Sequence, residues 1–222
     1  MKISIPQVDL VIDCKKDTCY SIIIENKKVL YEILCDIKQQ LDGGDGAIVL
    51  SEDNRVLDIS KYAELLTQFI PFEINQKSLL NKVMVRFQQI AMDEQHYCDT
   101  SELLSTIESY LLDLSVELTG NLKFVKTVWD SILKAIGVEF EDDYNSLAEK
   151  ILDYLELVRE YDKEKLFITF NLRSFIPDVE MRDFLKDIMA RNYQIIMIES
   201  SEYAILDGEK RYIIDENLCV MC

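Results

Sequence analysis

One short apolar run, Leu166 to Asn171 (LFITFN), constrains the fold of this chain more than any other segment. The run is rich in aromatic and β-branched side chains and is too short for an independent helix, so it predicts a strand buried on both faces. A buried strand with a polar end is where many nucleotide-hydrolysing α/β proteins place a metal-binding aspartate. Here that position holds the neutral Asn171.

The composition predicts a folded and strongly acidic protein. Of the 222 residues, 49% are hydrophobic, which is ample for a core. No run of about 18 apolar residues occurs, and residues 1–6 lack the apolar segment of a signal peptide, so we expect a cytoplasmic protein without a membrane span. The formal charge of −17 repels polyanions, so any nucleic acid must meet a segregated basic surface.

The six cysteines are interpreted as reduced thiols rather than as a disulfide framework. Two pairs, Cys14 with Cys19 and Cys219 with Cys222, leave two interpretations open. They could form a four-thiolate zinc site if the two segments met. Since cysteine spacing alone is weak support for a metal site, small core or turn residues are the favoured interpretation.

The first quarter of the chain has the pattern of strands around one helix. Residues 8–13 and 20–25 are apolar, β-branched runs around a polar turn, which predicts a hairpin. Helical spacing follows over residues 29–41 and ends at the Gly-Gly-Asp-Gly run of residues 43–46. Residues 47–51 predict another strand, so the order is compatible with a βαβ unit.

The junction before this helix does not have the sequence of a phosphate-binding loop. A Walker A loop needs glycines followed by Lys and Ser or Thr, but Glu25 to Lys28 stand here instead. The glycines at 43–46 come after the helix and are interpreted as a turn. We therefore expect no nucleotide cofactor.

Residues 59–161 have an almost uninterrupted helical pattern. The predicted helices cover residues 60–70, 76–92, a segment that starts with a capping box at Asp99, 122–136 and 146–161. After residues 166–171, the pattern predicts a helix at 178–191, a strand at 194–199 and a terminal strand or hairpin from Arg211.

Two of the predicted helices carry cations opposite their apolar faces. Lys82 and Arg86 fall on one side of the helix at 76–92. On the helix at 122–136, three lysines project within about a third of a turn of each other. These are Lys123, Lys126 and Lys134. Such stripes are either ordinary solvated helix faces or a surface that binds phosphates.

The chain has no clear catalytic constellation. The acidic residues between Glu139 and Asp143 could hold magnesium in a nuclease, but such runs are more often solvated connections. His96 is the only histidine and has no Ser or Cys triad context. We expect a protein without enzymatic activity.

Four segments of the second half of the chain together resemble a known family. They are Lys165–Asn171, Ile196–Glu199, Tyr212–Asn217, and Lys134–Gly137 with the following residues 138–141. The chain resembles the Csn2 family of type II-A CRISPR-associated adaptation proteins, which show a KKLLIFxN strand, an apolar strand ending in Glu and a YILDED close. Length and element order agree over essentially the whole chain, and the similarity is faint before about residue 75.

The resemblance implies an α/β fold with two domains. A P-loop-like head domain with a degenerate nucleotide site would comprise residues 1–58 and 163–222, and an inserted all-helical leg domain residues 59–162. The family forms a homotetrameric ring that encloses double-stranded DNA and binds its free ends. It works with the CRISPR integrase complex and the effector nuclease in spacer acquisition, a step of antiviral defence.

With this resemblance, phosphate binding becomes the favoured interpretation of the two cationic stripes. The DNA-binding candidates are Lys82, Arg86, Lys123, Lys126 and Lys134. Calcium stabilises the ring in characterised members, and the candidate calcium ligands are Glu117, Glu141 and Asp142. Because Thr119 and Asn121 stand where the family has acids, this sequence predicts a weak calcium site or none, unless Asp113 or the run 139–143 substitutes.

Two other classes of function remain open from the sequence. An NTPase on the same α/β core predicts nucleotide binding, which the absent Walker A lysine and Asn171 argue against. An acidic scaffold that binds only proteins predicts no retention of DNA, even at about 50 mM salt.

Overall fold

The structure is a computed structural model that describes residues 1–120, 122–124 and 128–221. The chain forms two compact units, Met1–Ile74 with Asp142–Cys222, and Asn75–Glu141. We call the first the sheet unit and the second the helical unit.

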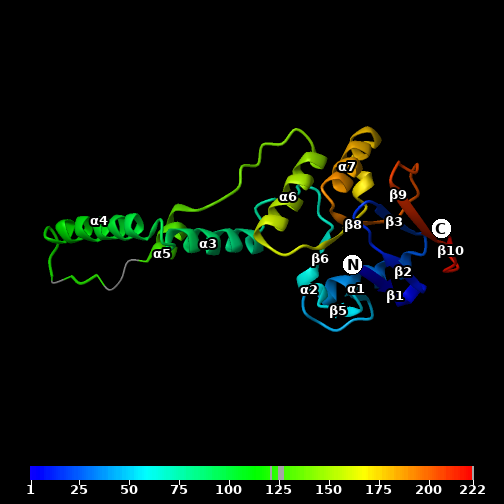
Figure 1. The fold of residues 1–222 in the computed structure, drawn as a ribbon, viewed down its shortest axis with the longest axis horizontal. Coiled ribbons are helices and arrows are strands. Elements are labelled where there is room, and N and C mark those ends of the chain that lie inside the picture. The colour runs from blue at the N-terminus through cyan, green and yellow to red at the C-terminus, as the bar shows by residue number, and fades with distance from the viewer. Residues whose placement is uncertain (121, 125–127, 222) are drawn as a thin grey trace. The chain divides into compact units, whose positions relative to one another are not determined.

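A six-stranded sheet forms the centre of the sheet unit (Figure 1), in the order β10-β9-β3-β8-β7-β6. All neighbours are parallel except β10 and β9. The strands are β3 (Cys19–Ile24), β6 (Ala63–Leu66), β7 (Leu166–Phe170), β8 (Gln194–Glu199), β9 (Glu209–Ile214) and β10 (Val220–Met221). A mixed α/β fold with a parallel sheet is confirmed, as are the predicted strands at 166–171 and 194–199 and the C-terminal hairpin.

Helices cover both faces of this sheet. α1 (Lys27–Leu41) packs Val29, Ile33 and Ile37 into the core cluster that contains Ile22 of β3. On the other face, α7 (Asp178–Ala190) receives a bond from Cys19 Sγ to the Leu185 carbonyl. α6 (Leu147–Tyr161) lies beside α7. Because both faces are covered, β3 and β8 are buried along their full length, as parallel strands usually are.

A second, antiparallel sheet has the order β2-β1-β4-β5. Its strands are β1 (Lys2–Ile5), β2 (Leu10–Asp13), β4 (Val49–Glu52) and β5 (Arg55–Leu57), and η1 (Pro6–Val8) turns the chain between the first two. The predicted hairpin of residues 8–13 with 20–25 is therefore wrong, and so is the βαβ unit. β1 and β2 alternate buried and exposed residues and pair with each other, which is typical of a sheet buried on one face.

The predicted helix at 60–70 is also wrong. Only α2 (Ile59–Tyr62) is helical there, and the chain then enters β6, which pairs with β7 from Ala63↔Leu166 to Leu66↔Thr169. Hydrogen bonding at the edge of the main sheet thus overrides the local helical pattern.

The helical unit contains α3 (Lys77–Ala91), α4 (Tyr97–Ser115) and α5 (Trp129–Ile136). Asn75 joins its two ends, since the side chain accepts from the Phe140 N–H at 2.7 Å and donates to the Phe140 carbonyl at 3.0 Å. α3 buries Leu79, Val83 and Ala91, whereas α4 buries only Thr100. In Figure 1, α4 continues away from α3 instead of packing along it.

The predicted domain boundaries at 59 and 162 differ from those of the compact units. The predicted leg is too long, because β6 is a strand of the main sheet and α6 buries Ile151, Leu155 and Val158 within the sheet unit. Among the described helices, none combines the length and the apolar character that a membrane span requires.

Candidate nucleic-acid interface

α3 carries three cations and no acid. Its sequence, KSLLNKVMVRFQQIA, places Lys82 and Arg86 four residues apart, so that they are neighbours on the helix surface. Lys82 is half-buried, and Arg86 is exposed and lies 3.5 Å from the Gln89 side-chain oxygen. Of the described helices with eight or more residues, α3 alone has cations without a carboxylate.

α4 has the opposite charge. It contains Asp99, Glu102, Glu108 and Asp113 and no Lys or Arg. α3 and α4 of the helical unit therefore carry charges of opposite sign. A protein of net charge −17 would need a segregated basic surface of this kind in order to bind a polyanion.

The second predicted cationic stripe does not form as predicted. α5 begins at Trp129, so Lys123 lies in an exposed segment without secondary structure, and Lys126 lies outside the described residues. Leu122 and Phe124 are exposed and offer no apolar face whose burial would stabilise a helix there. Lys134 is on α5, but its ammonium pairs with Asp130 at 2.6 Å.

The predicted calcium ligands do not form a calcium shell. Glu117 follows the end of α4, Glu141 closes the helical unit, and the Asp142 carboxylate pairs with the Lys150 ammonium at 2.5 Å. Throughout residues 1–120, 122–124 and 128–221, no three His, Cys, Asp or Glu side chains are grouped so that they could hold a metal ion. These described side chains therefore do not by themselves supply the six to eight oxygens that calcium prefers.

The described cysteines of the zinc interpretation lie in different environments. Cys14 and Cys19 are buried, and burial raises the pKa of both thiols to about 12. Cys14 donates to the Ile12 carbonyl, while Cys219 is exposed and Cys222 is outside the described residues. Cys14 and Cys19 therefore act as small core residues.

The carboxyl end of β7 is tied to the end of β8 by Asn171. This residue adopts a left-handed backbone with φ 53°, and its side-chain oxygen accepts from the Ser200 N–H at 2.8 Å and the Ser200 hydroxyl at 2.9 Å. The polar residue at the end of the central strand is thus engaged within the chain.

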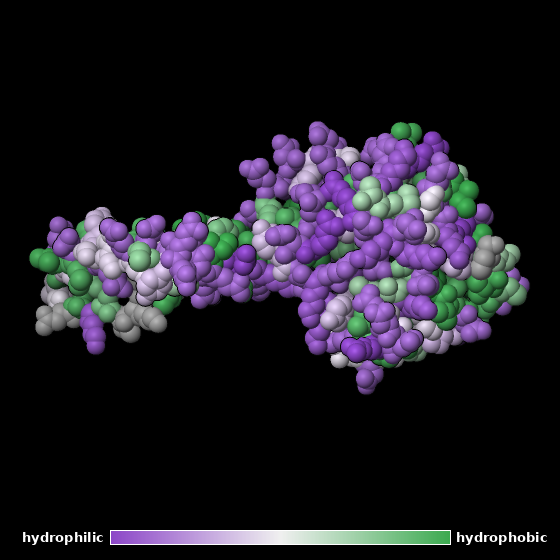
Figure 2. All heavy atoms as spheres, in the orientation of Figure 1, coloured by the Kyte–Doolittle hydropathy of each residue, from purple (hydrophilic) through white to green (hydrophobic). Residues whose placement is uncertain are grey.

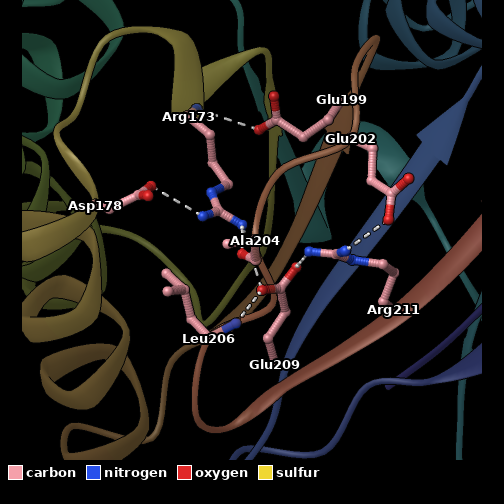
Figure 3. A network of polar contacts seen from close by, with 8 residues as sticks. All are labelled: Arg173, Asp178, Glu199, Glu202, Ala204, Leu206, Glu209 and Arg211. Carbon is pink, nitrogen blue, oxygen red and sulfur yellow. Dashed lines mark hydrogen bonds and ion pairs between the residues drawn. The ribbon is translucent and has the colours of Figure 1, made fainter.

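Next to Asn171, a buried arginine organises a polar network (Figure 3). The Arg173 side chain is 1% exposed. The backbone N–H of Arg173 donates to Glu199 Oε1 at 3.2 Å. Its guanidinium donates to the Ala204 carbonyl at 2.9 Å and contacts the Glu209 carboxylate at 3.4 Å and that of Asp178 at 3.1 Å. The network connects the ends of β7 and β8 with the start of β9.

Glu209 and Glu199 differ in how well their charges are compensated. The Glu209 side chain is fully buried, and it also accepts from the Leu206 N–H at 2.9 Å and from Arg211 at 3.2 Å. Glu199 is fully buried too, and in the described part of the chain its Oε2 has no hydrogen-bond partner. Burial raises the pKa of Glu199, and the nearby Arg173 partly opposes this effect, so that the pKa is about 7. Sequence reasoning missed this network, because only the folded chain brings residues 173, 199 and 209 together.

The N-terminus of α1 occupies the position of a phosphate loop after β3. Asn26 caps this helix, and its side-chain oxygen accepts from the N–H groups of Lys28 and Val29, both at 3.2 Å. Its amide nitrogen donates to the Glu216 carbonyl at 3.0 Å. N–H groups that would cradle a phosphate are therefore bonded within the chain.

The fold and the site define an α/β protein with an inserted helical unit that carries a cationic helix. A family model described as CRISPR-associated protein (Cas_Csn2) matches residues 40–218. The chain therefore belongs to the Csn2 family of CRISPR-associated proteins, and the resemblance noted in the sequence is confirmed.

Two known proteins extend this comparison. The CRISPR-associated protein Csn2 of Enterococcus faecalis is 20% identical over 154 residues, which cover 69% of each chain. The crystal structure of Stu0660 of Streptococcus thermophilus has a TM-score of 0.58 at 13% identity, covering 91% of this chain and 69% of that one. It supports the fold alone. A putative ABC transporter ATP-binding protein from Pyrococcus furiosus reaches a TM-score of only 0.41, at 12% identity over 95% of this chain and 97% of that chain, and no argument rests on it.

Proposed function

We propose that this protein binds double-stranded DNA without sequence preference, at duplex ends, and acts in CRISPR spacer acquisition. The observation that carries the proposal is α3, which presents Lys82 and Arg86 in a helix without any acid. Cations that contact phosphates confer affinity without sequence information, which suits a protein that must accept any DNA end. Lys123, Lys126 and Lys134 would contribute further cations, Lys134 after release from Asp130.

We propose further that the binding form is a homotetrameric ring. α4 and the segment after it expose large apolar side chains, and Figure 2 shows hydrophobic residues at the surface of this unit. They include Tyr110 at 63%, Leu112 at 51%, Val116 at 84% and Leu118 at 60% exposure. An apolar surface of this extent is typical of a protein–protein contact, and further copies of the chain would cover it.

The sheet unit would be a P-loop-like head that has lost nucleotide chemistry. The capped N-terminus of α1 and the internally bonded Asn171 support this part of the proposal. The head would hold the helical unit in place around DNA in the cytoplasm. By analogy with the family, its partners would be the CRISPR integrase complex and the effector nuclease.

The proposal is tested by titrating the full chain with fluorescent linear duplex and with closed circular duplex of equal length. We expect clear preference for the linear form at about 50 mM salt, where phosphate contacts are strongest. The double variant Lys82→Glu with Arg86→Glu should lose binding and keep its oligomeric state in light scattering.

The matched control is Lys27→Glu with Lys28→Glu, which makes the same charge change on exposed residues of α1. It should retain most of the affinity. Equal affinity for circles would contradict end binding. Equal behaviour of the two double variants would remove α3 from the interface.

A further inference from the structure

A groove of about 470 Å³ lies between α6 and α7 in the sheet unit, far in sequence from the cationic helix. Its apolar floor is made by Ala148 and Leu152 of α6 and Phe184 of α7. The two helices lie side by side (Figure 1). Both walls of the groove therefore belong to one compact unit.

Two stripes of carboxylates line the walls. Glu180, Asp183 and Asp187 follow one another at spacings of three and four residues, which places them on one face of α7. On α6, Glu149 and Asp153 are four residues apart and line the opposite wall, and Glu156 continues their row. Like charges at these spacings repel each other, so packing alone gives no reason to place them together.

The helix dipole explains only part of this arrangement. Glu149 and Glu180 lie in the first turns of their helices, where a negative charge is favourable. Asp153 and Asp183 lie beyond those turns. Asp187 lies in the last turn of α7, where a negative charge is unfavourable.

The cations within reach compensate few of these acids. Arg191 is the only Lys or Arg among the lining residues, and it pairs with Glu156. Lys186 pairs with Asp183 at 3.0 Å, but both side chains are about 70% exposed, at 67% and 71%. Glu180 and Asp187 have no ion-pair partner among the residues that the structure describes.

The spacing of the carboxylates selects the kind of cation that fits. Within the described ranges, no three acidic side chains converge on one point as metal ligands would. Carboxylates spread along two parallel helices instead match several cations in a row. The apolar floor between them matches an apolar side chain among those cations.

We propose that the α6–α7 groove is a docking site for a lysine- or arginine-rich segment of a partner protein that also carries an apolar side chain. The groove repels DNA, so it is separate in role from the proposed DNA surface. Its occupant would join the protein while the cationic helix stays available for a duplex.

The test uses the full chain and a short fluorescein-labelled peptide with arginine at alternate positions and one leucine. Fluorescence anisotropy should show saturable binding that weakens with salt. The variant Glu180→Gln with Asp183→Asn and Asp187→Asn should bind the peptide on the order of tenfold more weakly, since each exposed pair contributes modestly. A peptide with serine in place of leucine should also bind more weakly.

The matched control is Glu32→Gln with Asp45→Asn and Asp207→Asn, which removes the same charge from exposed positions outside the groove. It should bind the peptide as the native chain does. Equal loss in both triple variants would overturn the proposal, because the overall charge would then be sufficient. Equal displacement of the peptide by spermine at matched charge concentration would overturn it too, because the groove would then accept any polycation.

A folding control keeps the test decisive. Neutralising repelling carboxylates should leave the melting temperature of the groove variant unchanged or raise it. The groove variant should bind linear duplex DNA as the native chain does. A loss of DNA binding in that variant would contradict the separation of the two surfaces.

Discussion

The two units of the chain differ in how far their side chains are buried and paired within the unit. In the sheet unit, β3, β7 and β8 are buried, and even the charged Arg173 and Glu209 find partners inside the unit. In the helical unit, α4 buries a single residue and leaves apolar side chains at the surface. A unit with its own core can serve as a scaffold. A helix such as α4, which buries no apolar side chain of its own, depends on what binds to it, and the proposed ring contacts therefore fall there.

The largest effect on this difference between the units is expected from removing the buried cation of the sheet unit. Arg173→Met should lower the free energy of unfolding by about 3–5 kcal/mol, because Glu209 and Glu199 would stay buried near an apolar side chain. Urea unfolding followed by circular dichroism measures this. The control Asp178→Asn, whose carboxylate is 53% exposed, should cost less than about 1 kcal/mol. Similar losses in the two variants would show that the network is not the buried unit described.

A pair of leucines compares the two units directly. Leu185 of α7 is fully buried, whereas Leu112 of α4 is 51% exposed. In dilute protein, Leu185→Ala should lower the free energy of unfolding by about 2–5 kcal/mol, whereas Leu112→Ala should change it by less than about 0.5 kcal/mol. At high concentration, Leu112→Ala should weaken association in light scattering. Equal losses of stability in dilute protein would mean that α4 already has a core of its own.

Glu199 should make the stability of the sheet unit depend on pH. Because its pKa is raised to about 7 from the ordinary 4.5, the folded protein binds this proton more tightly than the unfolded chain does. The stability that protonated Glu199 contributes is complete below pH 4.5 and is lost as the pH rises through about 7. At pH 8, Glu199→Gln should be more stable than the native chain by roughly 3 kcal/mol.

The measurement is a series of unfolding curves of both proteins between pH 4 and pH 8. The difference between them isolates Glu199 from the other carboxylates. A difference that does not change with pH would mean that the buried carboxyl titrates normally.

The elements that sequence reasoning predicted are those with strong local patterns. Residues 166–171 and 194–199 are apolar runs of strand length, and Ser146 caps α6 as its capping-box pattern predicts, accepting from the Glu149 N–H at 3.2 Å. These signals are local, so one sequence was sufficient. The alternating pattern of β1 was not recognised as a strand. Because β1 pairs with β2 and β4, these two strands belong to the second sheet, and the predicted hairpin and βαβ unit do not form.

The features that the sequence did not predict depend on contacts between residues far apart in the chain. β6 has a helical pattern but forms edge hydrogen bonds with β7, a strand about a hundred residues later in the chain. The network of Arg173 likewise depends on three segments that only folding brings together. For the candidate site, the charge pattern of α3 was readable from the sequence. The described part of the segment around Lys123 is not helical, and its apolar residues Leu122 and Phe124 are exposed.

The most direct test of the central claim is the salt dependence of DNA binding with and without the α3 cations. The logarithm of affinity of the native chain for a linear duplex should fall linearly with the logarithm of salt concentration, with a slope of roughly 0.9 per phosphate neutralised. For Lys82→Ala with Arg86→Ala, the account predicts a shallower slope, reduced by roughly 0.9 for each contact removed. An unchanged slope in that variant would contradict the claim that α3 contacts the DNA backbone.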